Sequence, residues 1–331
     1  MSNNADVGRF LQLFVRHWYM LKRPEIVSYN AIEWMSRTIV LLASLTISAC
    51  AHLAPAEDEL SPGAIEPVKV YLLAGQSNMD GRGDGTMLSD DDHARLVKVQ
   101  DRVMLAYNGE PVRPLGLTTP QPWVAKKFDL EKTFGPELFF GIEMAEALPT
   151  SEILLIKRSL GGTSLYGSWN PNWSLDKADL MGEADRPMLY SELLKSIDLA
   201  LTSLEPGTFD FAGVLWVQGE TDSNVKKFGP LPAESYGENL ASLIAAIRRD
   251  VGAPDLPFHI LQVGGGAVVD GMRETSTAMR NVYFIPQSYS PDNPNYLPKY
   301  GPPVGHYNYT GMKRIGLLFS DSVLTSSGTT Q

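Results

Sequence analysis

Short aliphatic runs alternate with longer stretches of helical periodicity from residue 68 onward. The runs of β-branched and aliphatic residues predict buried strands at 68–74, 152–157, 211–217, 258–263 and 282–285. Apolar residues at helical spacing predict helices at 137–147, 188–204, 236–251 and 310–325. This alternation is typical of an α/β fold, in which helices flank a mostly parallel, doubly wound sheet.

Composition and charge narrow the classes of function. The chain has 28 Lys and Arg against 38 Asp and Glu, for a formal net charge of −10. Nucleic-acid binding requires a basic surface that neutralises phosphates, so we expect no DNA or RNA partner. One Cys and five His exclude a disulfide framework and a multi-cysteine metal site. We therefore expect neither a metal nor a cofactor.

An apolar segment at 37–49, RTIVLLASLTISA, precedes the periodic part of the chain. It is too short to span a bilayer as a stable helix and is typical of the hydrophobic part of a signal peptide. Its end, Ile47-Ser48-Ala49-Cys50, resembles the lipobox at which bacterial lipoproteins are cleaved. We expect a lipid on Cys50 that anchors the protein to a membrane of the bacterial cell envelope. The alternative is that Cys50 is a buried thiol behind a core helix.

The segments before residue 68 differ in composition from the rest. Residues 1–49 are predicted to be an N-terminal lead and lipoprotein signal peptide, and 50–67 an acidic linker with several prolines. One domain is predicted at 68–331. Because residues 1–34 precede Met35, we expect translation to start at Met35. A longer, genuine cytoplasmic lead is the alternative.

The first predicted strand is followed directly by Gly75-Gln76-Ser77-Asn78-Met79. In a doubly wound sheet, functional residues gather at the carboxyl ends of the strands. A serine at such a strand end can be presented on a tight turn into a helix, with its hydroxyl group free. The alternative is a serine that caps the N-terminus of a helix.

Four further blocks follow GQSNM in order: GPE at 135–137, GGTSLYGSW at 161–169, WVQGETD at 216–222 and GHYNYTG at 305–311. Together they resemble the SGNH hydrolases, in particular the sialate O-acetylesterase-like branch that includes carbohydrate esterase family six. The resemblance covers the whole body of the chain. It implies a three-layer α/β/α, flavodoxin-like fold and a nucleophilic Ser77.

A serine nucleophile needs a general base, and His306 is the candidate. It lies in a loop rich in Gly, Pro and Tyr before the last predicted helix, which Asn308 or Thr310 can cap. The resemblance also places the catalytic histidine in this block. The other histidines fall in the lead (His17), the linker (His52), an acidic surface run (His93) and a predicted strand, where a core role is expected (His259).

Glu220 is the predicted acid of the triad. Most SGNH enzymes have an Asp three residues before the histidine, and in this chain that position is Pro303. The family-six branch assigns the acid role to the glutamate of its Q-G-E block, which implies Glu220. Asp222 and Asp292 are alternatives, and Glu220 could instead be a structural carboxylate.

The oxyanion hole is expected to combine several hydrogen-bond donors. One is the backbone N–H of Ser77. A second is the backbone N–H of Gly162, since the Gly161-Gly162 pair has no Cβ that would block a substrate. The resemblance implies that the side-chain amide of Gln218 is the third.

Residues next to these blocks are candidates for substrate binding. We expect Gln76, Asn78 and Trp169 to contact the substrate. Aromatic rings in the nearby loops could also stack on sugar faces, with rim packing as the alternative: Trp123, Tyr166 and Trp173.

These features predict a lipid-anchored serine esterase that removes O-acetyl groups from an oligosaccharide or polysaccharide through an acetyl-enzyme. Two alternatives stand beside it. One is a broader SGNH lipase or thioesterase, and the other is a non-catalytic carbohydrate-binding lipoprotein, suggested by Pro303. The sequence sets neither the glycan nor the oligomeric state.

Overall fold

The computed structural model describes residues 66–202, 204–302 and 305–328. The predicted signal peptide, Cys50, most of the predicted linker and Pro303 lie outside these residues. Within the described ranges, no helix is both long enough and apolar enough to cross a bilayer.

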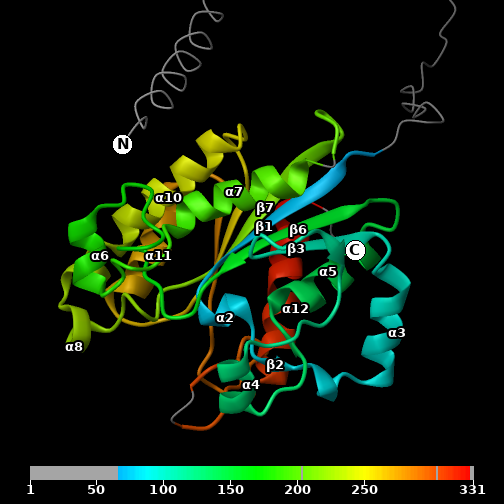
Figure 1. Cartoon of the computed structure of the whole chain (residues 1–331), viewed down its shortest axis with the longest axis horizontal. Helices are drawn as coiled ribbons and strands as arrows, with labels where there is room; N and C mark the ends of the chain where they lie inside the picture. Colours follow the sequence, from blue (N-terminus) through cyan, green and yellow to red (C-terminus); the bar gives the residue numbers. More distant parts are fainter. Residues whose placement is uncertain (1–65, 203, 303–304, 329–331) are drawn as a thin grey trace, which may run out of the picture. The chain divides into compact units, whose positions relative to one another are not determined.

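A seven-stranded sheet forms the centre of the described part of the chain, in the order β4-β3-β6-β1-β7-β8-β9 (Figure 1). The strands are β1 (Val68–Gly75), β3 (Val103–Tyr107), β4 (Arg113–Pro114), β6 (Ile153–Ser159), β7 (Phe209–Val217), β8 (Phe258–Leu261) and β9 (Val282–Ile285). All neighbours pair in parallel except β3 and the edge strand β4. The predicted α/β fold with a mostly parallel sheet is confirmed, whereas β3 and β4 were not predicted.

Helices cover both faces of the sheet. Figure 1 shows α7 and α10 on one face and α5 and α12 on the other. The longer helices are α3 (Asp90–Val99), α5 (Pro136–Ala147), α7 (Leu189–Leu201), α10 (Tyr236–Asp250), α11 (Ala267–Ala278) and α12 (Tyr309–Ser326). The four predicted helices correspond to α5, α7, α10 and α12, whereas α3 and α11 were not predicted.

Short elements fill the loops between the strands. They are α2 (Ser77–Asp80), α4 (Pro122–Phe128), α6 (Leu175–Met181), α8 (Val225–Phe228), α9 (Leu231–Glu234), a 3-10 helix at Gly85–Met87 and a small antiparallel pair of β2 (Gly83–Asp84) and β5 (Thr133–Phe134). A four-residue helix such as α2 is not stable alone, so its position depends on the contacts that surround it.

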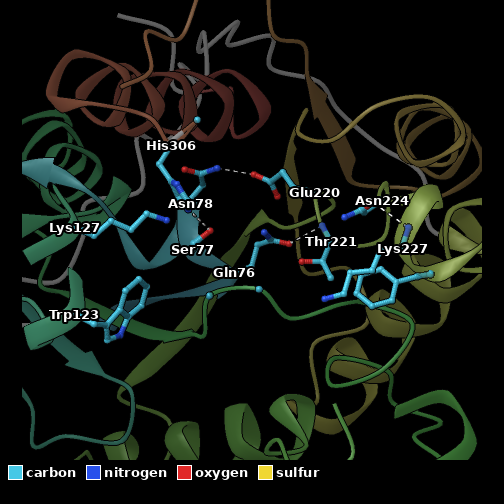
Figure 2. Close-up of a pocket in the computed structure, with 14 residues that line it drawn as sticks. Gln76, Ser77, Asn78, Trp123, Lys127, Glu220, Thr221, Asn224, Lys227 and His306 are labelled. Carbon is cyan, nitrogen blue, oxygen red and sulfur yellow. Dashed lines mark hydrogen bonds between the residues drawn. The ribbon is translucent and has the colours of Figure 1, made fainter. Parts of the chain in front are cut away.

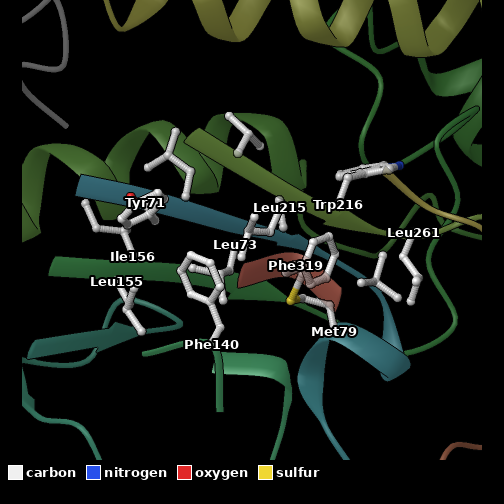
Figure 3. Close-up of a cluster of buried hydrophobic side chains, with 14 of the residues drawn as sticks. Tyr71, Leu73, Met79, Phe140, Leu155, Ile156, Leu215, Trp216, Leu261 and Phe319 are labelled. Carbon is white, nitrogen blue, oxygen red and sulfur yellow. The ribbon is translucent and has the colours of Figure 1, made fainter. Parts of the chain in front are cut away.

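The core divides into two layers because side chains of a strand point alternately to its two faces. Tyr71 of β1 meets the ring of Phe140 edge-on, with ring centroids 5.0 Å apart. Figure 3 shows Phe140 of α5 and Phe319 of α12 on the same side of β1. On the opposite face, Trp216 of β7 packs edge-on against Trp169 at 5.2 Å.

A buried ion pair lies within this core. Lys157 of β6 and Glu137 of α5 are both buried, with Nζ and Oε2 only 2.6 Å apart. Lys157 Nζ also donates to the backbone oxygen of Asp80 at 2.9 Å. The pair therefore connects the sheet, α5 and the C-terminal end of α2.

We expect Glu137→Ala to lower the free energy of unfolding by about 3–5 kcal/mol, because it leaves the Lys157 ammonium buried without its counter-ion. Urea denaturation at pH 7 measures this loss. The matched control is the double variant Glu137→Leu/Lys157→Met, which removes both charges and is expected to recover most of the stability. A loss below about 1 kcal/mol in the single variant would contradict the prediction.

His259 is a core residue, as the sequence predicted. It is fully buried on β8, its Nδ1 lies 2.7 Å from Ser322 Oγ, and its ring stacks on Tyr283 at 5.0 Å. Burial lowers the pKa of this histidine to about 4, because the charged imidazolium is poorly solvated there.

The lowered pKa of His259 predicts a loss of stability in acid. An unfolded chain takes up this proton near pH 6.5, whereas the folded chain resists it down to about pH 4, so stability falls as pH decreases between these values. Through His259 alone, the free energy of unfolding is expected to be about 2 kcal/mol lower at pH 5 than at pH 8. We expect His259→Gln to lack this share of the pH dependence when both proteins are unfolded in urea at pH 5 and pH 8. Identical pH dependences would show that His259 is protonated equally in both states.

Candidate active site

The GQSNM block forms the tight turn that joins β1 to α2. A Cβ at Gly75 would lie 2.1 Å from the backbone oxygen of Val217, so only glycine allows β1 and β7 to end this close together. Gln76 N donates to the same oxygen at 3.0 Å. Ser77 thus begins α2 at the carboxyl edge of the sheet, where the sequence predicted a functional serine.

The structure brings Ser77 and His306 together although they are far apart in the sequence. Ser77 Oγ and His306 Nε2 are 3.0 Å apart, a distance at which the imidazole can accept the hydroxyl proton. Asn308 fixes the loop that carries His306, since its side chain caps α12 by accepting from Gly311 N at 3.1 Å. Phe128 of α4 packs edge-on against the imidazole at 5.2 Å.

Both side chains open onto a pocket of about 480 Å³ (Figure 2). It is a size that suits a small ligand. The lining residues come from the carboxyl ends of the central strands, from α4, from α8 and its N-cap, and from the loop before α12: Gln76, Ser77, Asn78, Trp123, Lys127, Gly161, Gly162, Glu220, Thr221, Asn224, Lys227, Phe228, Gly305 and His306.

Glu220 lines this pocket but does not make the expected hydrogen bond to His306. Its Oε1 accepts from Asn78 Nδ2 at 2.6 Å, and its buried Oε2 has no hydrogen-bond partner. Asn78 Oδ1 in turn accepts from the backbone N–H of Tyr307 at 3.4 Å. Burial raises the pKa of the Glu220 carboxyl, and the hydrogen bond from Asn78 acts in the opposite direction. Glu220 is thus connected to the histidine loop through Asn78.

The two alternative acids lie elsewhere. Asp222 is buried, and its carboxylate accepts from the backbone N–H groups of Leu165 and Tyr166, each at 3.0 Å. Burial raises the pKa of Asp222 to about 7, against the lowering effect of its hydrogen bonds. Asp292 is exposed and does not line the pocket.

Gln218 does not reach the pocket, which corrects the expectation that it supplies an oxyanion donor. Its side chain is fully buried, and Nε2 donates to Asp222 Oδ2 at 2.6 Å, to Thr163 O at 3.1 Å and to Gln76 Oε1 at 3.3 Å. An amide nitrogen has two hydrogens, so these three acceptors leave none for a substrate.

Gly161 and Gly162 stand beside Ser77, as expected. A Cβ at Gly161 would lie 3.3 Å from Ser77 Cβ, and Gly162 has a left-handed backbone with φ of +69°. The Nη1 atom of Arg186 donates to the backbone oxygens of Gly161 at 2.9 Å and Gly162 at 3.2 Å. Because a trans peptide directs its N–H opposite to its C=O, the Gly162 N–H points away from Arg186. No motif in the sequence marked Arg186 for this position.

The structure also corrects the expectation for Trp169. Its side chain is fully buried against Trp216, so it cannot contact a substrate. Neither Tyr166 nor Trp173 lines the pocket. Trp123 of α4 does, and 53% of its surface is exposed.

A cluster of polar and charged side chains around Asp80 fixes the C-terminal end of α2. The Asp80 carboxylate accepts from Arg82 Nη1 at 2.6 Å, from Ser159 Oγ at 3.0 Å and from the hydroxyl of Tyr107. The Arg82 guanidinium lies 5.6 Å from the ring centres of both Trp123 and Phe128.

Within the described ranges, no group of three or more His, Cys, Asp or Glu side chains is arranged to hold a metal ion.

This chain is similar in sequence to a curated protein and in structure to several solved proteins. A curated relative, a probable carbohydrate esterase of Arabidopsis thaliana, is 27% identical over 240 residues, which is 69% of this chain and 82% of the relative. The X-ray structure of an Arabidopsis thaliana protein superposes with a TM-score of 0.54 at 21% identity, covering 78% of this chain and 98% of that one. The structure of NanS gives a TM-score of 0.52 at 18% identity, covering 80% and 100%. At these identities the two structures show a shared fold.

A family model described as carbohydrate esterase, sialic acid-specific acetylesterase matches residues 67–323. The match spans the whole α/β domain, from the start of β1 to the last turns of α12, and includes every residue of the pocket. This chain therefore belongs to the carbohydrate esterase family of sialic acid-specific acetylesterases, and it is an ester hydrolase.

Proposed function

We propose that this protein removes O-acetyl groups from a carbohydrate through an acetyl-enzyme, with Ser77 as nucleophile and His306 as general base. The observation that carries the proposal is the 3.0 Å approach of Ser77 Oγ and His306 Nε2 inside the pocket. A serine hydroxyl is weakly nucleophilic by itself, and a neutral imidazole at this distance activates it by taking its proton.

The reaction follows from this arrangement. Ser77 Oγ attacks the acetyl carbonyl carbon while His306 Nε2 takes the hydroxyl proton. The negative charge on the carbonyl oxygen is stabilised by backbone N–H groups at Ser77 and Gly162. The imidazolium then gives its proton to the departing sugar oxygen, which leaves an acetyl ester on Ser77. In the second step, His306 takes a proton from a water molecule while the water oxygen attacks the carbonyl carbon of this ester. The imidazolium then returns the proton to Ser77 Oγ as acetate leaves.

The side chains at the rim of the pocket favour an acidic sugar, one that carries a carboxylate, as the substrate. Trp123 offers an exposed ring for stacking on a sugar face. Lys127 and Lys227 contribute two cationic side chains to the lining, in a chain whose net charge is −10. The family model is described as specific for sialic acid, which is an acidic sugar. We therefore propose that acetylated acidic sugars are better substrates than acetylated neutral ones such as acetylxylan.

Glu220 completes the proposed Ser-His-Glu set as a positioning residue. It acts through Asn78, which donates to Glu220 and accepts from the N–H of Tyr307, the residue after His306. This chain of hydrogen bonds holds the histidine loop beside Ser77.

We also propose that Cys50 carries a lipid anchor and that the protein lies in the bacterial cell envelope. The lipobox-like sequence that ends at Cys50 supports this part of the proposal.

Replacing the nucleophile tests the main proposal. We expect Ser77→Ala to lower kcat for 4-nitrophenyl acetate by at least about 10³-fold and to abolish covalent labelling by an organophosphonate, because it removes the hydroxyl that forms the proposed acyl-enzyme. Acetate release from O-acetylated sialic acid and from acetylxylan, measured in parallel, reports the preferred sugar. Ser276→Ala on α11 is the matched control, since it removes a hydroxyl that donates to Arg273 O within its helix and does not line the pocket. Equal labelling of Ser77→Ala and wild type would overturn the proposal.

The role of Glu220 is tested by comparing two variants. Glu220→Gln keeps an oxygen that can accept from Asn78, whereas Glu220→Ala loses it. A positioning role predicts that the Gln variant stays within about tenfold of wild-type kcat while the Ala variant falls further. A charge that directly stabilises the imidazolium predicts that both variants fall, by about 10⁴-fold. The pH profile of kcat/KM for both variants distinguishes these outcomes, because only the second shifts the pKa of the catalytic base.

A further inference from the structure

The partners of Gln218 fix the orientation of the side chain next to it. Thr163 O can only accept a hydrogen bond, and it lies 3.1 Å from one end of the Gln218 carboxamide, which must therefore be the NH2 end. The other end accepts from the hydroxyl of Tyr236 at 3.0 Å. Gln218 thus presents its NH2 group, and not its oxygen, to Gln76.

Because Gln218 presents an NH2 group, the end of the Gln76 carboxamide that faces it must be the oxygen, which accepts a hydrogen bond. Its Oε1 accepts from Gln218 Nε2 at 3.3 Å and from the backbone N–H of Thr221 at 3.4 Å. Figure 2 shows the Gln76 carboxamide between Ser77 and Thr221, with the hydrogen bond on the Thr221 side. With Oε1 turned toward two donors, the Nε2 group is directed away from them.

In this arrangement the Oε1 atom of Gln76 has partners among the described residues, whereas its donor atom Nε2 has none. The residue is 96% buried, with 4% of its surface exposed, and it lines the pocket beside Ser77. No described residue accepts a hydrogen bond from Nε2, yet this atom is not among those sealed in the core without a partner. Its hydrogens are therefore open to the pocket.

We propose that the side-chain amide of Gln76, held by Gln218 and Thr221, is the third donor of the oxyanion hole. This assignment rests on the proposed function, since it concerns the same acyl transfer. The hole is then formed by the Ser77 N–H, the Gly162 N–H and Gln76 Nε2, which come from two chain segments, the turn between β1 and α2 and the loop after β6. Gln218 acts as a positioning residue, because it fixes which end of the Gln76 carboxamide faces the substrate.

An isosteric substitution separates donor and scaffold. Gln76→Glu keeps an oxygen for Gln218 and Thr221 but replaces the donating NH2 group by a second oxygen. We expect kcat for 4-nitrophenyl acetate to fall by about 10²–10³-fold with KM within threefold of wild type, the pattern of a donor used only in the transition state. Gln76→Met, which is neutral and has no donor, is expected to show the same pattern.

The controls address charge and folding. Gln121→Glu makes the same chemical change at an exposed residue that does not line the pocket, and it keeps an oxygen that can accept from Trp123 Nε1. We expect its kcat to stay within threefold of wild type. Thermal unfolding of the full-length variants establishes that each is folded, and the Met variant decides the result if the Glu variant is not.

Each outcome has a defined meaning. Normal kcat with a raised KM in both Gln76 variants would make Gln76 a ground-state substrate contact and overturn the assignment. Loss of kcat in Gln76→Glu but not in Gln76→Met would show a charge effect and overturn it as well. If Ser77→Ala is inactive in these cases, the proposed esterase function stands without this donor. If Ser77→Ala is as active as wild type, both the function and the assignment fail.

Discussion

One buried carboxylate connects the segments from which the pocket is built. Asp222 accepts from two consecutive backbone N–H groups of the loop after β6, at Leu165 and Tyr166, and from the side chain of Gln218 after β7. The loop that carries Gly161 and Gly162 is therefore held in position relative to Ser77 by a residue that follows a different strand, β7. Burial raises the pKa of Asp222 to about 7, and the three donors offset part of this cost by stabilising the charged form.

Polar contacts also fix the helix that begins with Ser77. The short α2 helix is fixed by Asp80, whose carboxylate accepts from Arg82 and Ser159, and by Lys157, which donates to the Asp80 backbone. Polar groups thus surround a serine at the edge of an otherwise apolar sheet. Rigid placement of this kind is what a site needs when its donors must already face the position where charge develops.

Much of the fold and the central pair could be predicted from the sequence. Buried parallel strands leave continuous aliphatic runs, so β1, β6 and β7 were predicted, and the rule that functional residues gather at the carboxyl ends of strands indicated Ser77. His306 was predicted from the positions of the other histidines and from the family resemblance. The five-residue β3 and the acidic start of α3 left weaker patterns. The directions of side chains were not predictable, because they depend on partners from distant segments. Trp169 follows a glycine-rich block but packs on Trp216, and Gln218 turns its amide toward Thr163 and Asp222.

A single short helix combines two tasks at the mouth of the pocket. On α4, Trp123 and Lys127 line the rim, while Phe128 packs against the imidazole of His306. The ring that we propose to stack on a sugar and the ring that packs against the proposed base therefore belong to one helix of seven residues. Under the proposed function, evolution of a new glycan preference through this helix is constrained, since a shift of its axis that suits another sugar also moves the residue that packs against His306. Asn224, Lys227 and Phe228 line the pocket from a separate helix, α8 with its N-cap, so substitutions there can alter the lining without moving α4.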